Sequence, residues 1–333
     1  MLQTPPNVSC SIHARIRETV RAEVHDDVHQ LTFRAMSTPA RICFRQDNPA
    51  VAADFQREVV EWVANFESRY SRFIPQSIIG QINAAAGDGV WHDIDEQDRE
   101  LFDLCDQMHS FTRGVFDPAA LPLLRLWDWK ANPPRVPDSQ AIDAARAVSG
   151  WDKVRRCRGQ IQLPLRGMGI DLGGIGKEYA VDCVLNMARQ RGMSNVLVDI
   201  GQDVRVCGKA PGKDAWYIGL EEPDQPGNCW TCLRLSDHAV ATSGDYLRCF
   251  TQGERRFGHI LDPRTGEPVN NRCQAATVIA PTCLLAGIFS TVAFILGPIE
   301  GLKLIQHYHG AEACITTADA RHQTRRFSYY VPA

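Results

Sequence analysis

Four short segments of the chain carry glycine, carboxylate and hydroxyl residues where an ordinary core would carry leucine. The first, DLGGIGK at residues 171–177, lies between a strand-like run and a helix-like run. Its glycines would let backbone N–H groups approach an anion, and Lys177 and the N-terminus of the next helix would add positive charge. The segment fits a phosphate cradle. A tight strand-to-helix turn with a surface lysine would look the same, because the spacing is neither GxGxxG nor a P-loop.

The other three segments offer a base, a carboxylate and aromatic rings. ATSGDY at 241–246 is followed by GHILDPRTG at 258–266, which places His259, Asp262 and Arg264 within six residues. Histidine is the side chain most readily poised for proton transfer near neutral pH. A polar hairpin would have the same composition. The fourth segment, TRGVFDP at 112–118, precedes Trp127, which could stack on a planar ring or fill a core.

The elements that must position these segments follow from the spacing of apolar residues and from turn signals. We expect a strand pair in 31–44, helices over 51–66 and 96–111, a third helix capped by Asp138 or Ser139, and a fourth between Gly174 and Gly192. Further strands are expected at 195–201, 203–208, 216–223, 232–237 and 239–244, then helices at 284–296 and 299–308 and strands at 313–318 and 325–331. Strands grouped after helices favour an α+β fold. Residues 1–30 are polar and suggest a mobile leader.

Charge and composition exclude several classes of protein. The chain has 333 residues with Lys+Arg 36 and Asp+Glu 39, so it lacks the basic excess of a nucleic-acid or anionic-membrane binder. The longest nearly apolar run, 284–297, is shorter than the ~20 residues that a membrane-spanning helix needs. The N-terminus has no apolar signal region, and we expect the twelve cysteines to be mostly buried thiols in a reducing cytoplasm. The CxxC spacing of Cys229 and Cys232 is attributed to chance.

Taken together and in this order, the segments resemble the family of FAD:protein FMN transferases, also called the ApbE or thiamine-biosynthesis lipoprotein family. The resemblance covers about residues 30–330. The matching motifs are Met36-Ser37-Thr38, SRYSRFIPQSIIGQIN at 68–83, GVFDPAALPLLRLWDW at 114–129, GIDLGGIGKEYAVD at 169–182, VDIGQDVRVCG at 198–208, ATSGDY, GHILDPRTGEPV at 258–269 and STVAFILG at 290–297.

The resemblance implies an α+β protein of mostly antiparallel sheets flanked by helices. Residues 31–330 would form a single catalytic domain of two intimately packed lobes, with a flavin cleft between them. The implied activity moves the FMN portion of FAD to a threonine hydroxyl of a target flavoprotein, with release of AMP and with help from Mg²⁺. The expected partners are FAD and that acceptor protein, with no nucleic acid and no membrane.

The resemblance also implies roles for individual residues. Lys177, Gly173 and Gly174 would face the phosphates, His259 would accept a proton or position the substrate, and Asp262 would support its turn. Residues in family segments that line the cofactor are Met36, Ser37, Thr38, Tyr70, Ser71, Asp117, Trp127, Asp171, Gly173, Gly174, Lys177, Asp182, Thr242, Ser243, Gly244, Asp245 and His259.

The metal motif departs from the family pattern. The family has an Asp four residues before the motif threonine, and these two residues hold the metal with a main-chain carbonyl. Here the threonine is Thr291, the carbonyl would come from Gly176, and the Asp position is Gly287. Glu178 replaces the family's usual glycine after the lysine and could supply the carboxylate. A first-turn glutamate is also favoured by the helix dipole, and we expect that second role, with the side chain in solvent.

Three other family positions also differ, at Ser37, Ala119 and Gln202. Two alternatives to transfer therefore stay open. One is a protein that binds FAD or FMN with lost or altered transferase activity. The other is an FAD pyrophosphatase, in which water replaces the threonine hydroxyl.

Overall fold

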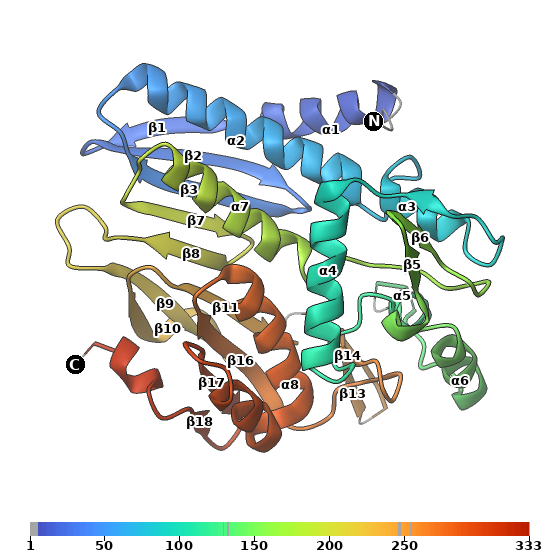
Figure 1. The fold of residues 1–333 in the computed structure, drawn as a ribbon. Coiled ribbons are helices and arrows are strands. Elements are labelled where there is room, and N and C mark those ends of the chain that lie inside the picture. The colour runs from blue at the N-terminus through green and yellow to red at the C-terminus, as the bar shows by residue number, and fades with distance from the viewer. Residues whose placement is uncertain (1–5, 129, 132, 246–247, 254, 333) are drawn as a thin grey trace.

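A nine-stranded antiparallel sheet forms the centre of the protein (Figure 1). The computed structural model describes residues 6–128, 130–131, 133–245, 248–253 and 255–332. The strand order is β1-β2-β3-β7-β8-β11-β16-β17-β18. The bounds are β1 Arg21–His25, β2 Val28–Ala35, β3 Thr38–Arg45, β7 Val196–Ile200, β8 Asp203–Cys207, β11 Ala239–Gly244, β16 Cys273–Ala280, β17 Glu312–Thr317 and β18 Arg321–Gln323.

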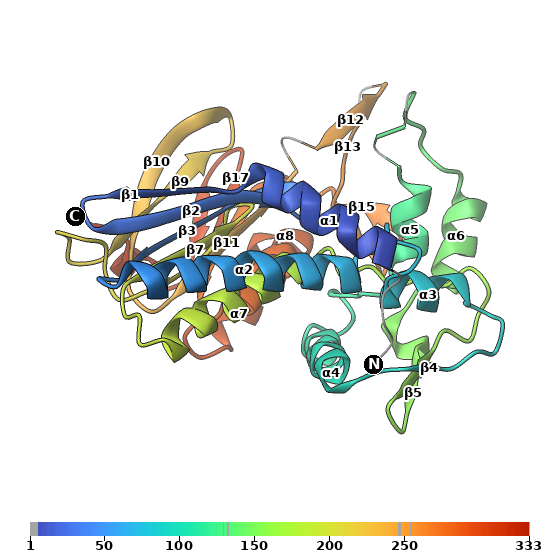
Figure 2. The same cartoon turned by 90° about the horizontal axis from the view of Figure 1, so that it is seen from above.

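Alternating side chains of the central strands serve two cores, as the two-residue period of a strand requires. In β7, Val196 and Val198 belong to the main core, which also includes the helices α2 (Pro49–Tyr70), α7 (Gly176–Gln190) and α8 (Cys283–Gln306). The residue between them, Leu197, faces a second core with the hairpin of β9 (Trp216–Glu222) and β10 (Gln225–Leu235). Figure 2 shows these helices on one side of the sheet and the hairpin on the other.

Shorter elements form a second part of the protein beside the sheet (Figure 1). They are α3 Ile78–Ala84, β4 His92–Asp93, α5 Leu121–Leu126, α6 Ser139–Ala147, β5 Arg155–Cys157, β6 Gln160–Gln162, β12 Cys249–Gln252, β13 Arg255–Gly258, β14 Leu261–Asp262 and β15 Glu267–Pro268, with a one-turn helix at Trp151–Lys153. Leu123, Trp127, Ile142, Phe257 and Leu261 make a separate apolar cluster there. The predicted α+β class with antiparallel sheets and flanking helices is confirmed.

Helix signals in the sequence are confirmed in detail. The helix α4 spans Glu96–Phe111, and a capping box of Asp95 and Asp98 starts it. The predicted stop follows, with Arg113 and Gly114 at φ of 53° and 78°. Asp138 caps α6 by accepting a hydrogen bond from Ala141 N at 2.7 Å.

The two predicted helices at the C-terminal end are joined in α8, which is broken where the sequence suggested. Gly297 has a φ of 79° and Pro298 follows it, so the helical hydrogen bonds are interrupted there. The side-chain amide of Asn271 donates to the carbonyls of Phe294 at 2.7 Å and Ile295 at 3.0 Å. The break is therefore stabilised by hydrogen bonds from outside the helix.

The expectation of a mobile leader over residues 1–30 is wrong for its larger part. Residues Pro6–Thr19 form a helix, α1, and β1 follows it. Ile12 and Ile16, one turn apart, are buried in the main core, and Arg17 pairs with Glu61 of α2 at 2.9 Å. The physical reason is this short apolar stripe, which the polar composition of the segment conceals.

The predicted strand at 325–331 is also wrong. The strand β18 ends at Gln323, and a one-turn helix at Phe327–Tyr330 follows. Glu312 accepts a hydrogen bond from Arg326 N at 3.1 Å, which turns the chain. Phe327 is thereby fully buried in the second core, whereas a strand would have carried it past the sheet.

The most apolar helix is a core helix by its packing. Within the described residues, α8 is the one helix long and apolar enough to cross a membrane, and it exceeds the 14-residue run seen in the sequence because it continues past Pro298. Of its most apolar stretch, 67% is buried inside the protein. Its composition is therefore accounted for by contacts with the sheet.

Candidate active site

A lysine and two carboxylates meet at the N-terminus of α7. The preceding turn is held by Asp171, whose Oδ1 accepts a hydrogen bond from Gly173 N at 2.8 Å. Lys177 then lies with its Nζ 3.3 Å from Glu178 Oε1 and 3.2 Å from Asp203 Oδ2, where β8 begins. The sequence prediction placed Lys177 in an anion site. Asp203 was missed, although it directly follows a tight turn between two strands.

The charges in this cluster do not balance. Burial alone would lower the pKa of Lys177, but the Glu178 and Asp203 carboxylates outweigh it and raise that pKa, so the ammonium stays charged. Burial and the negative charge of Glu178 raise the pKa of Asp203 to about 7, although Lys177 acts against this. Two acidic groups thus share one ammonium ion, and a further positive charge would stabilise the ionised form of both.

Glu178 is buried rather than solvent-facing, so the predicted orientation is wrong. Its side chain is 7% exposed. A Cβ atom at Gly287 would lie only 3.0 Å from its Cδ and Oε1 atoms and nearer still to its Cγ. The reason is the packing of α7 on α8, where the absence of a side chain at position 287 leaves room for the glutamate.

Hydroxyl groups continue the site from α8 to β11. Ser243 Oγ lies 2.9 Å from Thr291 Oγ1 and 2.8 Å from Ser290 Oγ. Its neighbour Thr242 pairs with Thr277 of β16 at 2.9 Å. Thr291 is four residues after Gly287, so the motif threonine lies one helical turn from the glycine that faces the buried glutamate.

The predicted base lies beyond the end of β11, next to an ion pair whose carboxylate is buried. Asp245 is 4% exposed and accepts hydrogen bonds from both terminal nitrogens of Arg256, at 2.9 and 3.0 Å. Gly258 leaves no room for a Cβ against Asp245, which brings the histidine segment close. Burial, with the positive charge of Arg248, lowers the pKa of His259 to about 4. His259 is therefore neutral at physiological pH and able to accept a proton.

The turn after His259 is held from two sides. Asp262 accepts from Arg264 Nε at 2.9 Å and from Nη2 at 2.7 Å, as predicted for a turn-supporting residue. Trp127 donates from Nε1 to the Gly266 carbonyl at 2.7 Å and stacks on Phe257 at 5.7 Å between ring centroids. Trp127 is 5% exposed, so its ring fills a core in this structure, and its predicted contact with a flavin stays untested.

The first strand pair adds a turn to the same end of the sheet. Met36 and Ser37 form the turn with φ of 49° and 63°. Met36 N donates to Glu67 Oε2 at 2.8 Å, and Thr38 packs on Gly201, directly before the turn that leads to Asp203. Glu67 was missed in the sequence, although an acidic residue on the apolar stripe of α2 is a usable signal.

Three predicted cofactor residues have partners that suffice for structural roles. Tyr70 donates to the buried Asp98 at 2.8 Å, which directs it toward α4. Asp117 accepts from Ala119 N at 2.8 Å and from Trp151 N at 3.3 Å. Next to Tyr70, the carbonyl of Ser71 accepts from Ser77 Oγ at 2.7 Å. Contact of these residues with a flavin stays a prediction.

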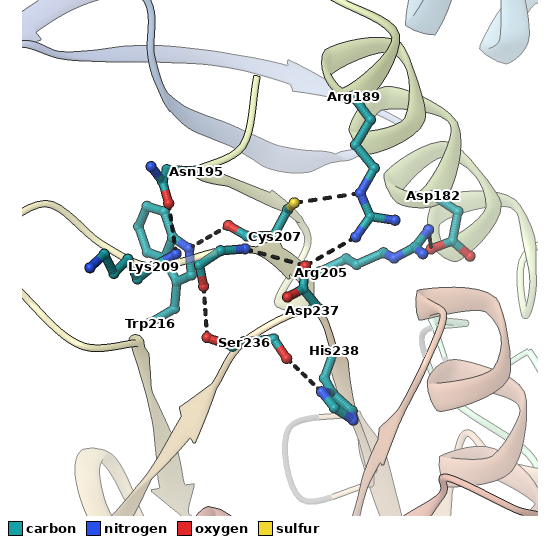
Figure 3. Close-up of polar contacts among 11 residues, drawn as sticks. Asp182, Arg189, Asn195, Arg205, Cys207, Lys209, Trp216, Ser236, Asp237 and His238 are labelled. Atoms are coloured by element: carbon teal, nitrogen blue, oxygen red, sulfur yellow. Dashed lines mark hydrogen bonds and ion pairs between the residues drawn. The ribbon is translucent and has the colours of Figure 1, made fainter. Parts of the chain in front are cut away.

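Asp182 has the clearest structural role. It accepts from Cys283 N at 2.8 Å and Leu284 N at 3.0 Å, at the start of α8, and from Arg205 at 2.9 Å. Burial raises the pKa of Asp182, while Arg205 and the two amides act in the opposite direction. Figure 3 shows Arg205 reaching Asp182 beside a network in which Arg189 contacts Cys207 and Asp237.

A polar pocket of about 320 Å³ opens beside the ion pair of Asp245 and Arg256. Its lining is Asp245, Arg255, Arg256, Val269, Asn270, Asn271, Arg272, Cys273 and Gln274. Three arginines in this lining make it suited to an anionic group.

The donors present fit a divalent cation of the kind that the resemblance implies. The Oε2 atom of Glu178 is buried without a hydrogen-bond partner, which is a costly state for a carboxylate. Magnesium prefers oxygen ligands and usually keeps water and substrate phosphate among them. Among the described residues no three His, Cys, Asp or Glu side chains cluster around one point, so hydroxyl, carbonyl or phosphate oxygens would have to complete such a site.

Comparisons with known proteins identify the family to which this chain belongs. The model of the ApbE family matches residues 36–315 of this chain. The chain belongs to the ApbE family. The solved structure of the flavin transferase ApbE from Vibrio cholerae superimposes with a TM-score of 0.82 at 25% identity, covering 93% of this chain and 100% of that one.

Curated relatives in the ApbE family carry one name. A protein called FAD:protein FMN transferase from Vibrio cholerae serotype O1 is 30% identical over 203 residues, and the match covers 60% of this chain and 61% of that protein. A protein of the same name from Klebsiella pneumoniae (strain 342) is 30% identical over 290 residues, covering 85% of this chain and 87% of the relative. The first match thus spans less than two thirds of its relative.

Proposed function

We propose that this protein transfers the FMN portion of FAD to a threonine hydroxyl of an acceptor protein. The threonine oxygen attacks the phosphorus of the FMN phosphate, and a new phosphoester bond forms. The bond from that phosphorus to the bridging oxygen of the pyrophosphate breaks, and AMP leaves with the bridging oxygen. The proton of the hydroxyl goes to a base, so atoms and charge balance without an oxidant or reductant.

The observation that carries the proposal is the continuity of the site. Lys177 pairs with Glu178, which packs against α8 at Gly287. Further along α8, Thr291 contacts Ser243 of β11, and Asp245, beside the histidine hairpin, follows that strand. Phosphoryl transfer needs positioning and positive charge on the phosphates, and less covalent participation by the protein. A charged lysine at a helix N-terminus and a neutral histidine supply what this chemistry requires.

Individual residues have distinct tasks in this reaction. Lys177 and the N-terminus of α7 bind phosphate oxygens. His259 is the proton acceptor, because its lowered pKa keeps the imidazole unprotonated. Asp262 holds the His259 hairpin through Arg264 and is therefore a positioning residue.

A divalent cation, for which Mg²⁺ is the candidate, would neutralise charge on the pyrophosphate when bound. Two donors implied by the family pattern, Thr291 and the Gly176 carbonyl, are present, while position 287 has no carboxylate. The single ammonium ion of Lys177 faces the two carboxyl groups of Glu178 and Asp203, so a bound cation would also compensate their negative charge.

Intact-mass analysis tests the proposal directly. Purified protein is incubated with FAD, Mg²⁺ and a flavoprotein or peptide that carries an acceptor threonine, and we expect the acceptor to gain the mass of an FMN phosphoester. FMN in place of FAD is the matched control, because it lacks the pyrophosphate bond that drives transfer. Release of AMP and FMN with no acceptor product would instead favour a pyrophosphatase.

A flavin-binding protein without transfer receives no support from the relatives, whose shared name describes transfer. FAD-dependent thermal stabilisation without any product would restore that alternative.

The cytoplasm remains the proposed location. The cysteines from Cys43 to Cys314 are unpaired, as expected in a reducing compartment. Cell fractionation tests this, and recovery of the protein outside the cytoplasmic fraction would contradict it.

A further inference from the structure

The side chain of Glu178 occupies the space that a side chain at position 287 would need. Only one of these two positions can therefore place a carboxylate in that space. The two residues come from different helices, α7 and α8, that pack together. A Cβ at Gly287 would approach the Glu178 Cδ and Oε1 atoms to 3.0 Å, closer than real Cβ contacts normally come. The glutamate side chain therefore occupies the space into which a side chain at position 287 would begin to grow.

The helix dipole does not explain why Glu178 is buried. A first-turn acid gains from the dipole while it remains in water, as Glu96 illustrates in the first turn of α4, where it is exposed. Glu178 has a side chain that is 7% exposed and an Oε2 atom with no hydrogen-bond partner. Burying a carboxylate with one oxygen unsatisfied is destabilising, so the position needs another reason.

The charged groups around Glu178 have an excess of negative charge. Lys177 already pairs with Asp203 at 3.2 Å as well as with Glu178, so two carboxylates share one ammonium ion. Thr291 is one turn along α8 from Gly287 and offers a hydroxyl oxygen. A hard divalent cation binds such carboxylate and hydroxyl oxygens.

We propose that Glu178 is the metal-binding carboxylate of this protein, supplied from α7 in place of one at position 287 of α8. The inference rests on the proposed function for the identity of the phosphate substrate. It goes further in assigning the anionic ligand, and metal binding can be measured without any catalysis.

Direct titration with Mn²⁺ alone, followed by electron paramagnetic resonance of the free ion, tests the assignment. Glu178→Gln keeps the shape of the side chain and removes its charge, and we expect it to weaken Mn²⁺ binding tenfold or more. Glu96→Gln is the matched control, because it removes the same group from an exposed position in the first turn of α4 and should leave Mn²⁺ affinity unchanged.

A double variant moves the carboxylate back across the interface. Glu178→Gly combined with Gly287→Asp should recover Mn²⁺ affinity to within about threefold of the original protein, because the acid then grows from α8 into the vacated space. Thermal unfolding of each variant establishes that it is folded. If the double variant does not fold, Glu178→Gln alone decides.

Wild-type affinity in folded Glu178→Gln overturns the inference, and so does the absence of Mn²⁺ binding by the original protein. A folded double variant that binds Mn²⁺ as weakly as Glu178→Gln also overturns it. Glu178-dependent Mn²⁺ binding without FMN transfer would leave the inference standing and reject the proposed function. FMN transfer together with Mn²⁺ binding that does not depend on Glu178 would support the proposed function and overturn the inference.

Discussion

Two acidic residues lie one turn apart on α7, and both are buried against α8. Asp182 meets the N-terminus of α8 and accepts hydrogen bonds from Cys283 N, Leu284 N and Arg205. Glu178 meets α8 at Gly287, one turn further along, and leaves Oε2 without a partner. The same helix pair thus holds one fully satisfied carboxylate and one that is half satisfied.

The difference separates a structural acid from a functional one. A buried carboxylate whose oxygens are all paired has its charge compensated within the fold. A buried carboxylate with an unpaired oxygen lowers stability unless a ligand completes it. Local conflicts of this kind tend to mark functional positions, so a buried carboxylate with an unpaired oxygen is a stronger indication of a site than burial alone.

The largest expected effect is the loss of stability on removing the satisfied acid. Asp182→Ala leaves Arg205 as an unpaired buried charge and removes the acceptor for the first two N–H groups of α8, so we expect a loss of about 3–5 kcal/mol in the free energy of unfolding. Glu178→Gln should change it by less than about 1 kcal/mol. Urea denaturation measures both. Equal losses of unfolding free energy for the two variants would contradict the distinction between a structural Asp182 and a functional Glu178.

His259, the proposed base, is a second residue to which we assign a functional and not a structural role. His259→Ala should lower transfer by about 10²-fold or more, while FAD affinity stays nearly unchanged, because the imidazole handles the acceptor proton. Steady-state kinetics and FAD titration measure the two quantities. A parallel loss of FAD binding would make His259 a structural residue of its hairpin.

The pH profile of kcat/KM sharpens this assignment. Burial, Arg248 and Arg256 lower the pKa of His259 to about 4, while Asp245 acts against them. The unprotonated form of His259 therefore persists down to about pH 4. We expect no decline of kcat/KM near pH 6.5 that is absent from the His259→Ala variant. An acidic limb centred near 6.5 in the original protein would contradict the buried state of this imidazole.

A smaller effect is expected from crowding at Gly287. Gly287→Ala places a methyl group against Glu178 and should cost about 1–3 kcal/mol of unfolding free energy. The same change in a Glu178→Gly background should cost much less, because the opposing side chain is gone. A double-mutant cycle by denaturation gives the coupling. No coupling would mean that the two residues do not share their volume.

The smallest effect concerns the turn that leads to Asp203. Gln202 has a φ of 72° and an exposed side chain, at a position where the family pattern has glycine. Gln202→Gly should stabilise the protein by about 0.5–1 kcal/mol, because glycine adopts this backbone without strain. Gln202→Ala keeps the Cβ and is the control, for which no gain is expected. Thermal unfolding distinguishes them.

Hydrophobic periodicity and capping residues correctly predicted those helices that depend on interactions between residues close in the sequence. The apolar stripe at 51–66 became α2, and Asp138 capped α6 as its type suggested. Order in α1 was missed because it depends on the contact of Ile12 and Ile16 with α2. The orientation of Glu178 was predicted wrongly for the same reason, since it is decided by a glycine on a distant helix. Spacing in a sequence does not report such packing.

The lack of room at Gly287 also has an evolutionary consequence. Exchange of the acid between the two helices requires two substitutions, and each single-step intermediate is impaired. Glutamate at 178 with aspartate at 287 crowds two carboxylates into one volume, while glycine at both positions removes the acid altogether. The two positions are therefore expected to change as a pair among family members, with glutamate after the motif lysine accompanied by a residue without a side chain four positions before the motif threonine.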